Sequence, residues 1–143
     1  MTVPMREVPA TIAALAVSGA VEVALRSLSL PRTARLFGAP LQQSATAAAP
    51  TAQRARLGVR GRRRARAVQR VMRHWPFGDT CLRHALVAGQ RLRGFGPELV
   101  VGVTKVDGRV RAHAWLEFET GIYDPLHAAS AFLPLTSPAP EDE

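Results

Sequence analysis

The sequence has a single cysteine in 143 residues, which excludes an intramolecular disulfide. Cys81 therefore gives no indication of an oxidising compartment, and we expect a cytoplasmic protein. Paired Cys-x-x-Cys and His-x-x-x-His spacings are also absent. His84 follows Cys81 at i+3 and could begin a zinc site with His74 or His127, but without a paired spacing we expect no metal and no cofactor.

Long apolar runs are absent as well. Residues 8–25 are rich in alanine and valine, but Glu22 and then Arg26 interrupt them before they reach the roughly 20 apolar residues that a spanning helix needs. The start of the chain is not basic enough, and Val17 to Ala20 is not distinct enough as a cleavage site, for a signal peptide. We expect no membrane span and interpret this segment as a docking helix.

Acidic residues are scarce relative to basic ones, 11 against 19, and the net charge is +8. Every base except Lys105 is an arginine. A positive field of this size favours anionic partners such as nucleic acid, a membrane surface or an acidic peptide. The length and the 47% hydrophobic content fit one domain with one core.

Helical spacing of apolar residues dominates the N-terminal third. It runs from Pro9 to about Leu30, and Pro31 is expected to stop the helix. A short helical turn ending at Gly38 follows. Residues 40–50 are low in charge and rich in Ala, Gln, Ser and Thr, which indicates a linker.

Nine arginines lie between Arg54 and Arg73. Among them, four apolar residues keep a helical period: Ala67, Val68, Val71 and Met72. This pattern predicts an amphipathic helix whose other face is densely basic. Two interpretations stay open. The face could bind an anionic peptide or nucleic acid, or it could be a solvated helix face in an arginine-biased proteome.

A further helix is predicted to begin at Cys81, because Asp79-Thr80 supplies an N-cap, and to end at Gly94. Cys81 then lies in the first turn. One apolar face is expected along this helix, made of Leu82, Ala85, Leu86, Gly89 and Leu92.

An antiparallel sheet is predicted to follow this helix. Leu99 to Val103 is a β-branched run suited to a buried strand, and Asp107-Gly108 is a hairpin signal. Arg109 to Phe118 alternates as a strand should, with His113, Trp115 and Glu117 on one face. Gly121 then turns the chain into a short strand at residues 122–124.

Cys81, His113 and Asp124 together form a candidate catalytic triad. A thiol attacks a carbonyl only as thiolate, and the positive end of a helix favours an anion at Cys81. His113 could take the proton of the thiol and later pass it to the leaving amine. Asp124 would orient the imidazole if the hairpin pairs it opposite Trp115, which makes it diagonal to His113.

Glu117 shares the face of His113 but lies roughly 13 Å along the same strand at 3.3 Å per residue, too far to orient the ring. For the oxyanion, the backbone N–H of Cys81 is one donor, and Trp75 and Trp115 are candidates for a second donor or for the wall of the cleft. A lone cysteine is more often buried filler, so the triad residues carry weight only as a set.

Three motifs follow one another in the second half of the chain: Cys-Leu-x-x-Ala-Leu at residues 81–86, a strand ending in Gly-Val at residues 102–103, and Ala-His-Ala-Trp-Leu-Glu at residues 112–117. In this order and spacing, residues 75–125 resemble the B2 proteins of lasso-peptide biosynthesis, which are transglutaminase-like leader peptidases. The N-terminal helices resemble that family more loosely.

The resemblance implies an α+β fold with a papain/transglutaminase-like core, in which the nucleophile helix is followed by a small antiparallel sheet. We expect an N-terminal helical region and linker over residues 1–50 and the core over residues 51–143, within one compact domain. Cys81, His113 and Asp124 fall where the triad of that family falls. The implied activity is that of a cysteine protease removing the leader from a ribosomally synthesised lasso precursor.

The resemblance also implies partners. In the stand-alone form of that family, a small separate protein binds the leader and delivers it, and an ATP-dependent cyclase then closes the freed core peptide. No winged-helix-like segment is evident in this sequence, which agrees with the stand-alone form, in which a separate protein recognises the leader. The basic helix could dock that partner or the leader through Arg62, Arg63, Arg64, Arg66 and Arg70.

Two other functions stay open. A basic nucleic-acid-binding protein is favoured by the net charge, but no recognised nucleic-acid motif accompanies the arginines, and only 6% of the residues are aromatic and able to stack on bases. We therefore expect no nucleic-acid partner. A transglutaminase-like acyltransferase would use the same triad with an amine in place of water, and the triad cannot distinguish the two.

Overall fold

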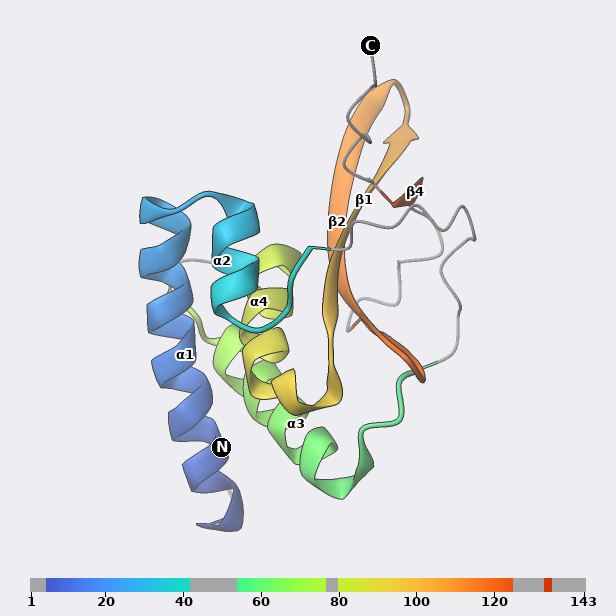
Figure 1. Cartoon of the computed structure of the whole chain (residues 1–143). Helices are drawn as coiled ribbons and strands as arrows, with labels where there is room; N and C mark the ends of the chain where they lie inside the picture. The colour runs from blue at the N-terminus through green and yellow to red at the C-terminus, as the bar shows by residue number, and fades with distance from the viewer. Residues whose placement is uncertain (1–4, 42–53, 77–79, 125–132, 135–143) are drawn as a thin grey trace.

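The computed structural model describes residues 5–41, 54–76, 80–124 and 133–134 (Figure 1). The helical elements are, in order, η1 (Met5–Glu7), α1 (Val8–Ser27), α2 (Leu30–Leu36), α3 (Gly58–Arg73), α4 (Cys81–Arg91) and η2 (Arg93–Phe95). The strands are β1 (Glu98–Val106), β2 (Arg109–Phe118), β3 (Gly121–Tyr123) and β4 (Leu133–Pro134). They form one antiparallel sheet in the order β3-β2-β1-β4, which confirms the predicted α+β class.

Helix α4 is the centre of the structure. It contacts α1 and α3 on one side and strands β1 and β2 on the other (Figure 1). Every residue from His84 to Gly89 is buried, so the single apolar face expected from sequence understates how much of this helix lies in the core. Its start follows the prediction, because the hydroxyl oxygen of Thr80 accepts a 3.2 Å hydrogen bond from the backbone N–H of Arg83.

The N-terminal helix differs from the expectation in its end and in its buried face. α1 ends at Ser27, and Pro31 lies in the first turn of α2, where a missing backbone N–H costs little. Ile12 and Leu15 are 61% and 53% exposed. The buried face consists instead of small residues, Val21 and a glutamate: Ala14, Ser18, Val21, Glu22 and Ala24.

By length and composition, the helical stretch Met5–Ser27 could cross a membrane, although the sequence pattern predicted no span. The core helix of a soluble protein and a signal sequence pass the same test. In this structure the side of the stretch that faces α3 and α4 carries Glu7 and Glu22, and both glutamates form ion pairs with arginines of those helices.

The β1–β2 hairpin has the predicted turn. Asp107 and Gly108 have φ of 51° and 76°, the left-handed values of a primed hairpin turn. The half of the hairpin near this turn extends beyond the helices (Figure 1), and residues 109–112 are exposed on both faces. Residues 113–116 are buried on both faces. Only this inner half of β2 belongs to the core, and it carries His113.

Two predicted boundaries are displaced. α4 ends at Arg91, before Gly94, and the glycine in the left-handed conformation is Gly96 with φ of 70°. Of the predicted linker, Pro40 and Leu41 run beside the start of β1, where the carbonyl of Pro40 accepts a 2.9 Å hydrogen bond from Leu99 N–H. Asp79, His127 and the rest of the linker lie outside the described residues.

Candidate active site

Cys81 is the first residue of α4 and is partly exposed. The backbone N–H groups of a first helical turn have no partner within the helix, so they point out of its N-terminus with the positive end of the helix dipole. A negative charge on the sulfur, or on an oxygen held beside it, is stabilised in this position. The N-cap of Thr80 fixes the turn that provides this environment.

His113 and Asp124 form a buried pair. The distance between His113 Nε2 and Asp124 Oδ1 is 2.9 Å, and the two side chains are 4% and 2% exposed. The strand register accounts for this contact. β3 pairs Tyr123 with Leu116, and continuing that register by one residue puts Asp124 opposite Trp115, diagonal to His113.

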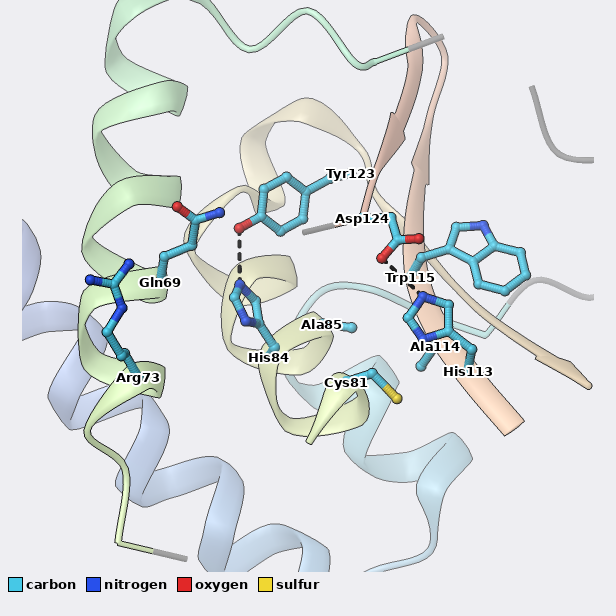
Figure 2. Close-up of a pocket in the computed structure, with 10 residues that line it drawn as sticks. All are labelled: Gln69, Arg73, Cys81, His84, Ala85, His113, Ala114, Trp115, Tyr123 and Asp124. Atoms are coloured by element: carbon cyan, nitrogen blue, oxygen red, sulfur yellow. Dashed lines mark hydrogen bonds and ion pairs between the residues drawn. The ribbon is translucent and has the colours of Figure 1, made fainter. Parts of the chain in front are cut away.

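The pair and the cysteine line one cavity of about 240 Å³ (Figure 2). In this view the Cys81 sulfur points toward the side of the cavity on which His113 lies. Because Nε2 of His113 is bonded to Asp124, Nδ1 is the ring nitrogen that remains to exchange a proton with the thiol. The cavity is lined by Gln69, Arg73, Cys81, His84, Ala85, His113, Ala114, Trp115, Tyr123 and Asp124.

Four polar residues of this cavity were not singled out for it from the sequence: Gln69, Arg73, His84 and Tyr123. His84 Nε2 lies 3.0 Å from the hydroxyl of Tyr123, and the two rings are tilted at 46° to each other. The spacing of His84 from Cys81, one helical turn, is a signal that could have placed it there. Gln69 comes from α3, and no sequence signal links it to the cysteine.

The two tryptophans proposed for the cleft lie in different places. Trp115 lines the cavity and stacks on His113, with ring centroids 5.7 Å apart. Its indole nitrogen points away from Cys81 (Figure 2) and has no hydrogen-bond partner among the described residues. Trp75 is not among the lining residues, and its indole N–H lies 3.5 Å from the carboxylate of Glu22.

The five arginines predicted to dock a partner also differ in their contacts. Arg66 and Arg70 both donate hydrogen bonds to the carboxylate of Glu7, at 3.2 and 2.9 Å. The bond from Arg70, and then that from Arg66, holds the pKa of Glu7 below its ordinary value. Arg64 donates to the backbone carbonyl of Arg91 at 3.1 Å. Arg62 and Arg63 form no ion pair with any described residue.

A second arginine contact fixes the nucleophile helix. Arg83, two residues after Cys81, binds both carboxylate oxygens of Glu22 through Nε at 2.7 Å and Nη2 at 3.1 Å. This forked hydrogen bond lowers the pKa of Glu22 and raises that of Arg83. The first turn of α4 is therefore tied to α1 at the end that carries the thiol.

No group of three or more metal-ligating side chains occurs among the described residues. The chemistry that the cavity offers is that of a thiol at a helix N-terminus, an imidazole and a carboxylate. In this order the three groups can activate a sulfur nucleophile, transfer its proton and stabilise the resulting imidazolium.

Comparison with known families agrees with this chemistry. The sequence model of the transglutaminase-like superfamily matches residues 20–137, which is more than half of the chain. The chain belongs to this superfamily, and its core is transglutaminase-like. The superfamily includes cysteine proteases and acyltransferases, which indicates thiol chemistry of that type. No curated protein and no solved structure matches the chain significantly.

Proposed function

We propose that this protein is a cysteine peptidase that removes the leader from a ribosomally synthesised lasso-peptide precursor. The observation that carries the proposal is the 2.9 Å contact between His113 and Asp124 in the cavity that also contains Cys81. The substrate class rests on the sequence resemblance of residues 75–125 to the lasso-peptide B2 proteins. A small leader-binding protein would deliver the precursor, and a cyclase would use the product.

The proposed reaction has two halves. The Cys81 thiolate attacks the scissile carbonyl while His113 holds the proton of the thiol, and the N–H groups at the start of α4 stabilise the oxyanion. His113 then gives this proton to the leaving amine, which departs with the core peptide, and the leader remains as a thioester. A water that loses its proton to His113 attacks the thioester, and the leader leaves as a carboxylic acid.

The experiment is cleavage of a lasso-precursor peptide in the presence of its leader-binding protein, with the products identified by mass spectrometry. Cys81→Ala is expected to abolish cleavage while circular dichroism and binding of the partner stay unchanged. His113→Ala is expected to lose at least about 100-fold in rate. His74→Ala is the matched control, because His74 is exposed and lies outside the cavity, and it should cleave at the normal rate.

Two results would change the proposal. Cleavage that persists in Cys81→Ala would remove Cys81 as the nucleophile. Addition of a primary amine tests the acyltransferase alternative, since transfer gives a leader whose new terminus is an amide, whereas hydrolysis gives a carboxylic acid. A predominantly amide product at low amine concentration would assign acyl transfer to the same triad.

A further inference from the structure

A second hollow of about 300 Å³ adjoins the catalytic cavity. Gln69, Tyr123 and Asp124 line both, so the two hollows lie side by side, and each has residues of α3 and β3 in its lining. We call the second hollow the arginine groove. A peptide with its scissile bond at Cys81 would extend beyond the cavity, and the arginine groove lies directly beside it.

The walls of the arginine groove are fixed by hydrogen bonds. The segment before α3 runs beside β3, where the N–H of Ala55 donates to the carbonyl of Ile122 at 2.9 Å. The N–H of Arg56 donates to the hydroxyl of Thr120, also at 2.9 Å. Ile122 and Tyr123 of β3 line the groove, and Asp124 directly follows this strand. The same strand therefore positions the groove relative to the triad.

The charges in the arginine groove are mostly positive. Three arginines line it, Arg54, Arg62 and Arg66, together with a single carboxylate, that of Asp124. His113 already binds Asp124, and Glu7 binds Arg66. Arg62 is exposed and has no ion pair among the described residues. The rest of the lining consists of Gln69 and Tyr123, which the groove shares with the catalytic cavity, and of four apolar residues that suit the aliphatic part of a side chain: Ala55, Leu57, Ala65 and Ile122.

We propose that the arginine groove is a substrate subsite that binds an acidic side chain of the peptide, a few residues from the scissile bond, with Arg62 as the main contact. This inference rests on the proposed peptidase function and adds the chemistry of the substrate. Guanidinium and carboxylate groups match in geometry as well as in charge, so an aspartate or glutamate binds here better than its amide. In this arrangement the arginines of α3 bind the same peptide that Cys81 cleaves.

The test uses the full-length protein and the precursor peptide that it cleaves. One aspartate is placed in turn at about four positions on each side of the scissile bond, which covers roughly 13 Å of extended chain on each side. Each aspartate peptide is compared with the peptide that has asparagine at the same position. At one position the asparagine peptide is expected to show a KM about tenfold higher, with little change in kcat, because a charge-assisted hydrogen bond is lost.

Charge reversal identifies the residue responsible. Arg62→Glu is expected to reverse the preference at that position, so that a lysine peptide is cleaved better than the aspartate peptide. Arg60→Glu changes the net charge of α3 by the same amount, but Arg60 lines neither hollow, so this control should keep the aspartate preference. Equal effects of the two variants would assign the preference to the overall field of the protein and overturn the subsite.

The outcomes separate this inference from the proposed function. Cleavage by the wild-type chain with no acidic preference at any position would remove the subsite and leave the peptidase. If no peptide is cleaved, the peptidase proposal fails. In that case the same aspartate and asparagine peptides are labelled with a fluorophore, and their binding to wild type and to Arg62→Glu is measured. If the wild type binds both peptides with equal affinity, the proposed subsite is overturned.

Discussion

At the scale of single residues, the His113–Asp124 contact is the feature on which the site depends most. Both side chains are buried, and the contact fixes the orientation of the imidazole and the nitrogen that faces the cavity. An amide oxygen can accept the same hydrogen bond from Nε2–H, although it cannot stabilise an imidazolium as a carboxylate does. Orientation and charge stabilisation can therefore be separated by two substitutions at one position.

We expect Asp124→Ala to lower kcat by about 100-fold or more, and Asp124→Asn to retain clearly more activity than the alanine variant. The reason is that asparagine keeps the ring oriented, whereas alanine leaves a buried nitrogen without its acceptor. Steady-state cleavage rates of both variants, with KM determined separately, provide the measurement. Equal rates for wild type and Asp124→Ala would show that Asp124 does not position His113.

At the scale of elements, the close approach of α4 to the segment after α2 depends on a glycine. A Cβ added at Gly89 would lie 2.6 Å from the Cβ of Ala39, a residue that is itself completely buried. Neither side can move without displacing backbone, so the absence of a side chain at Gly89 sets the distance between the helix and this segment.

Gly89→Ala is accordingly expected to destabilise the protein by about 1–3 kcal/mol, although alanine is the better helix former. Gly19→Ala is the matched control, because Gly19 lies within α1 and a Cβ there would meet nothing within 4 Å. This control should gain up to about 1 kcal/mol. Urea unfolding of both variants decides the matter, and a stabilised Gly89→Ala would show that the core accommodates a methyl group there.

Some boundaries of the helices and strands could be predicted from the sequence, and others could not. The start of α4 at Cys81 and the hairpin at Asp107-Gly108 were predictable because capping and turn residues act locally. The buried face of α1 was not predictable from spacing. This face packs against α3 and α4, which come much later in the chain, and Arg83 of α4 binds the buried carboxylate of Glu22, while Ile12 stays exposed.

The same limit applies to the candidate site. The position of Asp124 was predicted only by assuming a register for the short hairpin, which the sequence does not fix; the structure pairs Leu116 with Tyr123, as that register requires. Gln69 lies on a different helix, and only the packing of α3 against α4 brings it to the cavity. Contacts of this kind depend on tertiary structure, so no local pattern predicts them.

At the scale of the whole molecule, two buried glutamates of the N-terminal segment join it to the rest of the chain. Glu7 binds α3 through Arg66 and Arg70, and Glu22 binds α4 through Arg83. Part of the positive charge of the arginine-rich region is therefore neutralised by ion pairs within the protein. The sequence suggested a docking helix, and these ion pairs show which charges dock it.

The ion pairs give stability a defined dependence on pH. Hydrogen bonds from the arginines lower the pKa values of Glu7 and Glu22 in the folded state, so the folded state binds fewer protons than the unfolded chain in acid. Their contribution is complete above the pKa of an unfolded glutamate, about 4.3, and is lost as the pH falls through the lowered values of the folded state. Glu22→Gln should therefore lower the urea midpoint at pH 7 and approach wild type in acid, as the pH falls through the lowered pKa of Glu22 and its carboxylate becomes protonated. Glu119→Gln, in the exposed turn between β2 and β3, should match wild type at both pH values. A deficit of Glu22→Gln that is as large in acid as at neutral pH would mean that packing, and not charge, holds α1 against α4.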